Sequence, residues 1–442
     1  MPTFPLTQGE YTCEFARMIL PRWLGFGCAL VLLVGSAPAS DWPQWRGPSR
    51  TGHVPEGEPV PDKLPVDPKT VWRLKVGEGL ASPVVAGGKV FCFDNTAGKE
   101  TLHAIDAASG KEFWRRPIDD PFSDMQGPTG PRCTPVVDDD RVYALSCKGE
   151  LQCLNTADGK LIWRVNFTND LGAVFIGEKG NAPGASRHGN NGSPLVDGDC
   201  LYACVGGVIG AGVACFDKRT GGIRWKSQND QAAYAAPVIA SLAGARQLIC
   251  FTVDGLIGLD PRDGKLFWRV PLKTAYARHV TTPVTHGDMV VVGSHQVGLV
   301  GTRISKAGDG LKAEQAWLRK DAAMNFASPI AVGKYLYGLG PAKNVLCVDF
   351  ETGEVLWSKE GLITTSADKA HAGFLVMGRN ILMLTDGGQL VLFAADPATC
   401  RELGRAQVCG LNWCNPAYAD GKLYVRDGIK GAGELICLEL LP

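Results

Sequence analysis

One phrase recurs along this chain of 442 residues and constrains its fold more than any other feature. It reads AIDAASGKEFW at residues 104–114, CLNTADGKLIW from 153, CFDKRTGGIRW from 215, GLDPRDGKLFW from 258 and CVDFETGEVLW from 347. Self-similarity of this kind is typical of repeat architectures, in which each unit buries its apolar face against its neighbours. The chain is therefore expected to form one array of similar units.

The residue pattern of each unit predicts a series of short strands. Seven units open on a small residue followed by Pro, at Pro83, Pro135, Pro194, Pro237, Pro283, Pro329 and Pro416. An eighth unit, from Ala372, keeps the strand pattern but has Phe374 at the proline position. Alternating apolar residues separated by Gly and Asp turns predict antiparallel hairpins. Eight units of about 40 to 60 residues predict an all-β fold, an eight-bladed β-propeller of four-stranded antiparallel blades.

The two ends of the repeat array predict how the ring closes. The last unit ends at LICLELLP without a Trp strand, whereas VWRLKV at residues 71–76 is a Trp strand with no unit before it. Pairing the two completes the last blade and removes two exposed edges. We expect the propeller to span residues 70–442, with its last blade closed by the N-terminal strand. Residues 40–69, which contain seven prolines, are expected to form an extended lead-in.

The N-terminal segment has the pattern of an export signal. Two arginines precede an apolar run over residues 24–34, and small residues then offer a cleavage point after Ala39. Met18 is an alternative start. The apolar run is too short to span a bilayer. We expect a signal peptide over residues 1–39 and a periplasmic or secreted mature chain without a transmembrane span.

The tryptophans of the repeat are expected to dock neighbouring blades. A large flat ring at a fixed distance from a turn can fill the wedge between two sheets, and burying it should contribute about 2 to 3 kcal/mol. The residues assigned to this structural role are Trp72, Trp114, Trp163, Trp225, Trp268, Trp317 and Trp357. The seventh unit, DPATCRELG, lacks the Trp and is expected to form the weakest joint.

The positions of the cysteines indicate packing rather than chemistry. Removal of the signal leaves 13 of the 15 cysteines, and none of them forms a CxxC motif, which argues against a zinc ribbon and a c-type haem. Cys153, Cys215, Cys347 and Cys437 share a repeat position that is Ala104, Gly258, Gly301 or Ala394 elsewhere. These thiols are expected to act as small buried hydrophobes. Cys409 and Cys414 are the candidate disulfide pair, if one forms.

Charge and motifs exclude several classes of function. The 45 basic residues balance the 45 acidic ones, so no general field attracts nucleic acid or an anionic membrane. The sequence contains no H-E-x-x-H, no G-x-S-x-G and no P-loop. No catalytic or metal-ligating residue is assigned.

The recurring phrase AxDxxTGxxxW resembles the Trp-docking repeat of pyrroloquinoline-quinone-dependent dehydrogenases. The same repeat occurs in non-enzymatic propellers such as the scaffold lipoprotein of the outer-membrane β-barrel assembly machine. DWPQWRG at residues 41–47, followed by such repeats, resembles exported bacterial PQQ-like β-propeller repeat proteins. The resemblance implies the propeller fold and leaves two functions open.

The first function is a non-catalytic exported scaffold that binds proteins or a ligand. Its expected partners are envelope proteins or a small anionic or hydroxyl-rich ligand, and it is expected to be a monomer without a cofactor. The alternative is a quinoprotein oxidoreductase acting on alcohols or sugars, with PQQ and calcium bound. Such enzymes typically carry two adjacent disulfide-bonded cysteines, and this sequence has no Cys-Cys pair. The scaffold is therefore the favoured hypothesis.

Propeller geometry predicts where a ligand would bind. The segments between each Trp strand and the next Pro-Val strand cross from the rim to the channel, so their ends should meet around one mouth. The candidate ligand-binding residues there are Arg132, Arg187, His188, Asn191, Tyr234, Arg278, His279, Asn325, His371 and Trp413. The mixture suits an anionic or hydroxyl-rich ligand or a peptide carboxylate. The alternative is that these residues hydrate the mouth. The third crossing, residues 166–191, is the longest and is a candidate lid.

Overall fold

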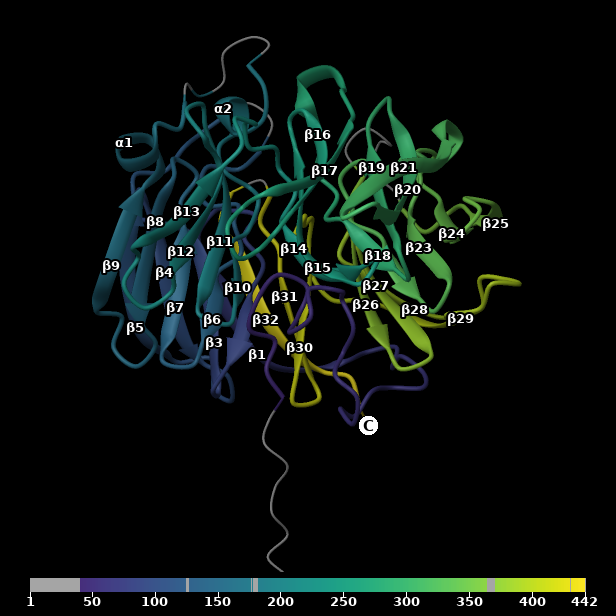
Figure 1. Ribbon diagram of the computed structural model, residues 1–442. Helices are drawn as coiled ribbons and strands as arrows, with labels where there is room; N and C mark the ends of the chain where they lie inside the picture. The colour runs from purple at the N-terminus through teal and green to yellow at the C-terminus, as the bar shows by residue number, and fades with distance from the viewer. Residues whose placement is uncertain are drawn as a thin grey trace, which may run out of the picture. The chain divides into compact units, whose positions relative to one another are not determined.

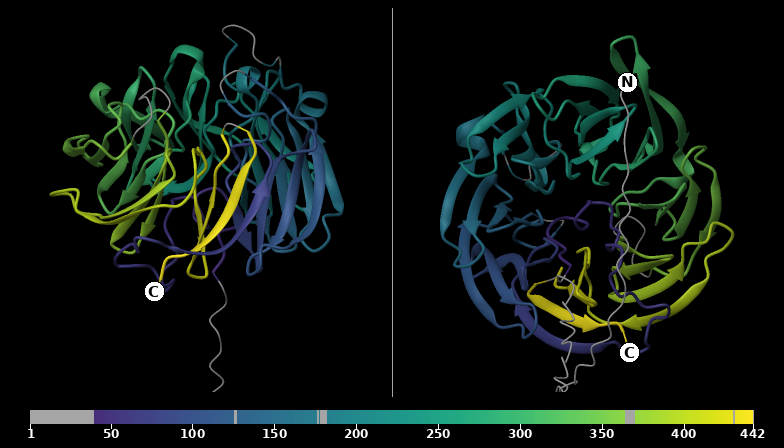
Figure 2. Two further views of the ribbon diagram at one scale, coloured as in Figure 1. Left: turned by 180° about the vertical axis from the view of Figure 1, so that it is seen from behind. Right: turned by 60° about the horizontal axis from the view of Figure 1, so that its bottom comes forward.

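The computed structural model describes residues 40–124, 127–175, 177, 182–363, 370–429 and 431–441. The predicted signal peptide lies outside the described residues. Within them, thirty-two strands form eight four-stranded antiparallel sheets. The sheets follow one another as blades around a ring, with the colours running round it from purple to yellow (Figures 1 and 2). The predicted eight-bladed β-propeller is confirmed.

The blades are numbered in chain order, with the strands of each blade in the order in which they pair. Blade 1 contains β2 (Val84–Ala86), β3 (Lys89–Thr96), β4 (Lys99–Asp106) and β5 (Glu112–Asp119). Blade 2 contains β6 (Val136–Asp138), β7 (Arg141–Leu145), β8 (Glu150–Asn155) and β9 (Leu161–Asn166). Blade 3 contains β10 (Leu195–Asp197), β11 (Cys200–Gly207), β12 (Ala211–Asp217) and β13 (Ile223–Ser227). Blade 4 contains β14 (Val238–Leu242), β15 (Ala245–Thr252), β16 (Gly255–Leu259) and β17 (Leu266–Pro271).

The second half of the ring repeats this order. Blade 5 contains β18 (Val284–His286), β19 (Met289–Ser294), β20 (Gly298–Ala307) and β21 (Gly310–Arg319). Blade 6 contains β22 (Ile330–Val332), β23 (Tyr335–Leu339), β24 (Val345–Asp349) and β25 (Val355–Lys359). Blade 7 contains β26 (Ala372–Met377), β27 (Asn380–Thr385), β28 (Gln389–Ala394) and β29 (Glu402–Gln407). Blade 8 contains β30 (Ala417–Ala419), β31 (Lys422–Arg426), β32 (Gly433–Glu439) and β1 (Lys69–Val76). The crossings carry the short helices α1 (Phe167–Leu171) and α2 (Ala185–His188) and the 3-10 turns η1 (Ala275–Ala277) and η2 (Lys320–Ala322).

The ring closes as the strand count predicted. β1 pairs antiparallel with β32, from Lys69 opposite Glu439 to Val76 opposite Gly433. The N-terminal strand therefore supplies the outer strand of the last blade. Because the two ends of the array share one sheet, the ring closes by backbone hydrogen bonds instead of leaving two free edges.

The prolines limit the inner strands. Proline has no N–H to donate, so pairing begins only after it. In blade 1, for example, Pro83 is followed by β2, which has three residues. In blade 7, where Phe374 replaces the proline, β26 has six residues and Phe374 pairs with Met383. The exception to the repeat is thus a longer strand at the channel.

The docking tryptophans occupy the predicted wedges. The indole N–H of Trp225 donates to the carbonyl of Pro261 in the next blade at 3.0 Å, and the ring lies over Gly264. A Cβ added to Gly264 would lie 2.6 Å from that ring. The same type of bond to a turn carbonyl of the next blade is made by Trp72, Trp114, Trp163, Trp317 and Trp357.

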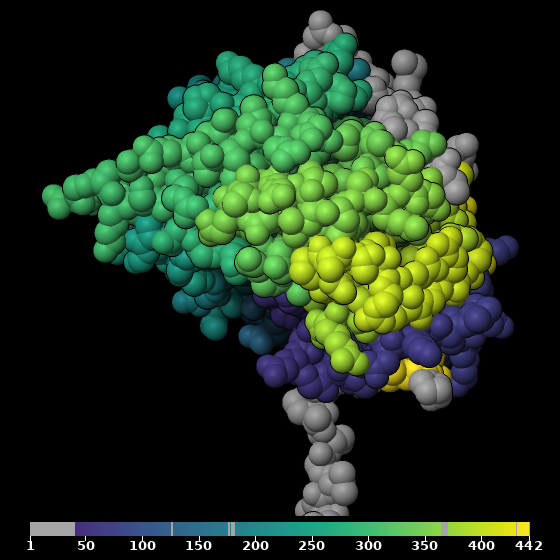
Figure 3. All heavy atoms as spheres, turned by 90° about the vertical axis from the view of Figure 1, so that its right-hand side faces the viewer, coloured from purple at the N-terminus to yellow at the C-terminus, as the bar shows by residue number. Residues whose placement is uncertain are grey.

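Trp268 fills its wedge differently. Its indole N–H donates to Gln247 Oε1 in its own blade at 2.6 Å. Blade 5 offers no tight turn at this place, because β20 and β21 are ten residues each and form a long hairpin. The hairpin stands out from the ring as the green lobe in Figure 3. Trp268 is nevertheless buried with Val290, Val300 and Ile304 of blade 5, so it still joins the two blades.

The small-residue slot of the repeat lies directly opposite each docking Trp. Cys153 pairs with Trp163 across the sheet, and Gly258 pairs with Trp268. A Cβ on Gly258 would lie 2.3 Å from the indole. The four thiols that share this slot are buried and free, as predicted. For unit 7 the alignment was wrong: the residue opposite the Trp position is Leu392, not Ala394, and it faces Gly404.

The remaining cysteines are also unpaired. All thirteen cysteines of the described residues are free thiols, so the conditional pair Cys409 and Cys414 is not bonded. Burial raises the pKa of Cys92 to about 12. A thiol with such a pKa is not the thiolate that reacts with oxidants and alkylating agents.

The lead-in packs tightly against the ring. Residues 41–54, called the plug below, include Trp42, Arg46 and Arg50, which are 1 %, 4 % and 3 % exposed. The plug forms hydrogen bonds to first-strand segments of six blades, through Val85, Val137, Pro194, Thr282, Pro329 and Val376. In Figure 2 this purple segment crosses the middle of the ring. A segment expected to be merely extended thus occupies one end of the channel.

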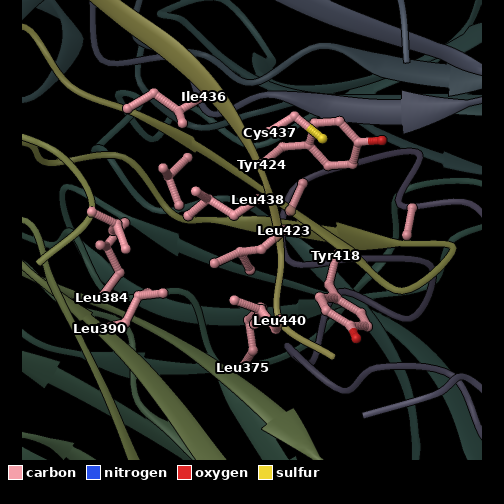
Figure 4. Packing of buried hydrophobic residues seen from close by; sticks show 14 of the residues in the cluster. Leu375, Leu384, Leu390, Tyr418, Leu423, Tyr424, Ile436, Cys437, Leu438 and Leu440 are labelled. Carbon is pink, nitrogen blue, oxygen red and sulfur yellow. The ribbon is translucent and has the colours of Figure 1, made fainter. Parts of the chain in front are cut away.

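The lead-in also seals the joint that lacks a tryptophan. A Cβ on Gly404 would lie 2.9 Å from Leu64 Cβ, and the Leu64 N–H donates to the carbonyl of Leu403 at 3.3 Å. Leu64 belongs to an apolar cluster that extends over blades 7, 8 and 1 and includes Tyr418 and Leu438 of blade 8 (Figure 4). The wedge left by the missing indole is therefore filled from outside the blade, and the expected weakness of this joint stays a prediction.

Candidate functional site

A pocket lies in the channel between the plug and the crossing segments. Trp45 of the plug lines one side, and Phe326, Trp413 and Leu80 from the crossings line the others. The space open to the centres of water-sized molecules is about 160 Å³, enough for several waters or one small ligand. Seven of the ten predicted ligand-binding residues line this pocket: Arg132, His188, Asn191, Tyr234, Arg278, His371 and Trp413.

One buried carboxylate, Asp124, positions two of the polar residues that line the pocket. Asp124, in the crossing after β5, accepts a hydrogen bond from the Arg132 guanidinium at 2.7 Å and lies 2.9 Å from His188 Nδ1. Its side chain is fully buried. Arg132 also donates to the His188 carbonyl at 2.7 Å. The crossing after β5 and the helix α2 are therefore fastened to each other, and the charge of Arg132 is balanced inside the protein.

The second cation of the pocket has no such partner. Among the described residues, no hydrogen bond or ion pair is made by the Arg278 guanidinium, which lies 5.7 Å from the centre of the Tyr276 ring. Tyr276 lies in η1 with a φ of 61°. The Arg187 guanidinium also lies over its ring, 4.5 Å from the ring centre. Arg187 therefore lies against Tyr276 and is not among the residues that line the pocket.

His371 contributes a neutral ring to the pocket. Complete burial lowers its pKa to about 4, so the imidazole is uncharged at neutral pH. Its Nδ1 is buried without a hydrogen-bond partner in the part of the chain that the structure describes. An unsatisfied buried nitrogen is uncommon and points to a ligand or water at the site.

Two further predicted residues lie elsewhere. His279 is fully buried, with its ring stacked on Phe251 at 4.1 Å and its Nδ1 2.6 Å from the Thr252 carbonyl. Arg278, by contrast, lines the channel pocket. The backbone makes a tight turn here, with Arg278 at φ -72° and ψ 55° and the His279 N–H donating to the Ala277 carbonyl at 2.7 Å. Asn325 lines a separate cavity beside His295.

Sequence reasoning missed several residues of the site. Asp124 and Trp45 carry no repeat signal, and Thr282, which precedes the repeat Pro283, was not assigned to the site. Each becomes part of the site only through the tertiary fold. The indole N–H of Trp45 donates to Thr282 Oγ1 at 2.9 Å, which fixes the ring against blade 5. The motif DWPQWRG carries a family resemblance, but nothing in it indicates that its second Trp faces a pocket.

The pocket does not fit a quinone held by calcium. Calcium takes about six to eight oxygen ligands, usually with several carboxylates. The residues that line the pocket include no Asp or Glu within the described ranges, and Asp124 is committed to Arg132 and His188. The described residues also form no cluster of three or more His, Cys, Asp or Glu side chains that could hold a metal ion. The side chains of this pocket therefore do not supply the ligand set that such a cofactor requires.

Comparison with known proteins identifies the relationships of the chain. The family described as "Outer membrane protein assembly factor BamB" matches residues 98–359. The BamB of Shewanella oneidensis is 23 % identical over 394 residues, which are 84 % of this chain and 90 % of that protein. The BamB of Burkholderia pseudomallei is 27 % identical over 252 residues, 55 % of each chain.

Solved structures with the same fold come from two functional groups. BamB from Moraxella catarrhalis has a TM-score of 0.57 and 14 % identity, and the match covers 84 % of this chain and all of that one. The quinohemoprotein alcohol dehydrogenase of Comamonas testosteroni has a TM-score of 0.58 and 14 % identity, covering 90 % and 80 %. At this identity the likeness shows the propeller fold in both cases and does not choose between the two groups.

Proposed function

Because this chain belongs to the family of outer membrane protein assembly factor BamB, we propose that it is a non-catalytic scaffold that binds other proteins of the cell envelope. The quinone chemistry of other propellers is not needed for this role, since a rigid ring that presents loops is sufficient. Loops held on a rigid scaffold commonly carry binding function. The chain would act in the periplasm, as a monomer, on partners engaged in outer-membrane protein assembly.

One exposed apolar patch on the crossing side of blade 3 carries this proposal. The tip of the β11–β12 hairpin presents Ile209 at 80 % and Val208 at 45 % exposure. Val174, at 42 % exposure, lies beside them, because Ala173 bridges Gly207. These three residues are called the blade 3 patch. Large apolar side chains gathered at a hairpin tip are typical of protein-binding surfaces rather than of a solvated turn.

The position of the patch suits a binding surface. α1 packs beneath it through buried Phe167 and Leu171, so the apolar side chains stand on a rigid base. Figure 1 shows α1 and α2 together at one end of the ring, away from the purple lead-in. The exposure of Ile209 and Val208 leaves their side chains accessible to a partner protein that meets the ring at its crossing side. The helices that the structure describes include none with the length and hydropathy of a membrane span.

The test is capture of a defined partner by the purified protein from an envelope extract. Wild-type protein should retain a component of the outer-membrane assembly machinery, identified by mass spectrometry and then shown to bind saturably as a purified protein. Ile209→Asp should weaken that binding at least about tenfold, since a charge replaces an apolar contact. Ile223→Asp is the matched control, because Ile223 is 47 % exposed on the outer strand β13, outside the patch.

Two results would count against the scaffold. The first is failure of the wild-type protein to bind any assembly component, or equal binding by the Ile209→Asp variant. The second is a new absorption band and substrate-dependent dye reduction after addition of the quinone and calcium, which would favour an oxidoreductase. Gel filtration of the purified protein tests the proposed monomer.

A further inference from the structure

The channel pocket combines apolar and aromatic walls with one guanidinium that has no partner among the described residues. Trp45 forms the floor, and Phe326 stacks on Trp413 with ring centres 5.5 Å apart and planes at 20°. Flat rings arranged in this way favour a flat apolar ligand. From these walls and the charge of Arg278, we propose that the pocket binds a small monocarboxylate with an aromatic body.

The charged residues of the pocket determine how many carboxylates the ligand can carry. Arg132 is neutralised by Asp124 at 2.7 Å. Arg278 also lines the pocket but forms no ion pair within the described residues. One uncompensated guanidinium in a largely apolar cavity calls for one negative charge, because each further buried charge would lack a partner. The ligand is thus a monoanion rather than a di- or tricarboxylate.

His371 provides a second polar contact for such a ligand. It is 5 % exposed, it lines the pocket, and its Nδ1 has no partner in the described chain. A neutral imidazole can donate or accept one hydrogen bond according to its tautomer. A carboxylate oxygen or a water bridged to it would satisfy a group that the protein itself leaves unpaired.

The N-terminal motif gains a role in this arrangement. Trp45 is held by its bond to Thr282 Oγ1, and the flanking plug is anchored by two buried arginines. Arg46 donates to the Pro329 carbonyl at 2.6 Å and Arg50 to the Pro194 carbonyl at 2.7 Å. These bonds connect the floor to opposite parts of the ring, and neither arginine is among the residues that line the pocket. The plug thereby closes the channel and holds Trp45 in place.

The test is isothermal titration of the purified full chain with phenylacetate. Its neutral isostere phenylacetamide and the tricarboxylate trimesate serve as matched probes. Phenylacetate should bind at least about tenfold more tightly than either of them. Arg278→Gln should weaken phenylacetate binding about tenfold while leaving the melting temperature and the weak binding of the amide unchanged. Arg401→Gln, in the exposed turn before β29, should behave as wild type.

A second variant tests binding in the pocket without changing any charge. Val280→Phe places a ring in the pocket and should abolish binding of all three probes in a protein that still folds. The proposal is overturned if the amide or trimesate binds as well as phenylacetate, if Arg278→Gln binds normally, or if no heat is measured at millimolar phenylacetate. Binding of the envelope partner by Arg278→Gln reports on the scaffold separately, since Arg278 lies outside the blade 3 patch.

Discussion

The turn glycine of the repeat is expected to be required by the neighbouring indole as well as by the turn. At Gly264 the backbone has a φ of +74°, and an added Cβ would lie 2.6 Å from Trp225 Cε3 and 2.9 Å from Ser227 Cβ. Ordinary carbon contacts are about 3.5 to 4.0 Å, so Gly264→Ala must move the indole by about 1 Å. Gly198 has a φ of +55° and nothing within 4 Å of its added Cβ. Comparing Gly264→Ala with Gly198→Ala therefore distinguishes the cost of backbone strain from the cost of the contact with the indole ring.

The expected magnitudes follow from these two environments. A left-handed conformation costs a residue with a Cβ about 1 to 2 kcal/mol, and both variants carry this cost. Overpacking against the indole adds about 1 to 3 kcal/mol at Gly264 alone. Gly264→Ala should therefore lower the free energy of unfolding by about 2 to 5 kcal/mol and Gly198→Ala by about 1 to 2 kcal/mol.

Equilibrium unfolding in urea, followed by circular dichroism, measures both values from the transition midpoints. Equal losses for the two variants would refute the reasoning, because the glycine would then serve the turn only. A fluorescence change at Trp225 in folded Gly264→Ala, absent in Gly198→Ala, would locate the effect at the indole.

Three further predictions test the joints, a buried ion pair and the thiols. Leu64→Ala should cost about 2 to 4 kcal/mol in urea unfolding, because it empties the wedge above Gly404, whereas Val66→Ala, at 88 % exposure, should cost nothing measurable. Burial alone would lower the pKa of His103, but its hydrogen bonds to Asp94 and Glu112 outweigh burial and raise it above 6.5. The difference in unfolding free energy between wild type and His103→Gln should therefore be fully present below about pH 6.5 and should decline as the pH rises through the raised pKa of the folded state. A difference that does not depend on pH would contradict this. Alkylation at mildly alkaline pH should label Cys92 only after unfolding, because burial raises its pKa to about 12, and rapid labelling of the folded protein, read by mass spectrometry, would show otherwise.

The repeat made much of the candidate site predictable, because it fixed which segments cross to the channel. Arg132, His188 and Arg278 were placed at the mouth by their position just before a Pro-Val strand, and all three line the pocket. His279 was included on the same argument but faces the blade, where it stacks on Phe251. Position in a crossing does not tell which of two neighbouring side chains turns inward, since that depends on the local backbone angles.

The sequence by itself determined the number of blades, the order of their strands and the closure of the ring. These features follow from local information, namely turn glycines, alternating apolar residues and an indole at a constant distance from each turn. Only the tertiary structure decided what fills the irregular places. Leu64 covers Gly404, the long β20–β21 hairpin replaces a turn beside Trp268, and Trp45 becomes the floor of a pocket. Each of these contacts joins segments far apart in the chain, and their partners are selected by the shape of the space left by the ring, which no local pattern encodes.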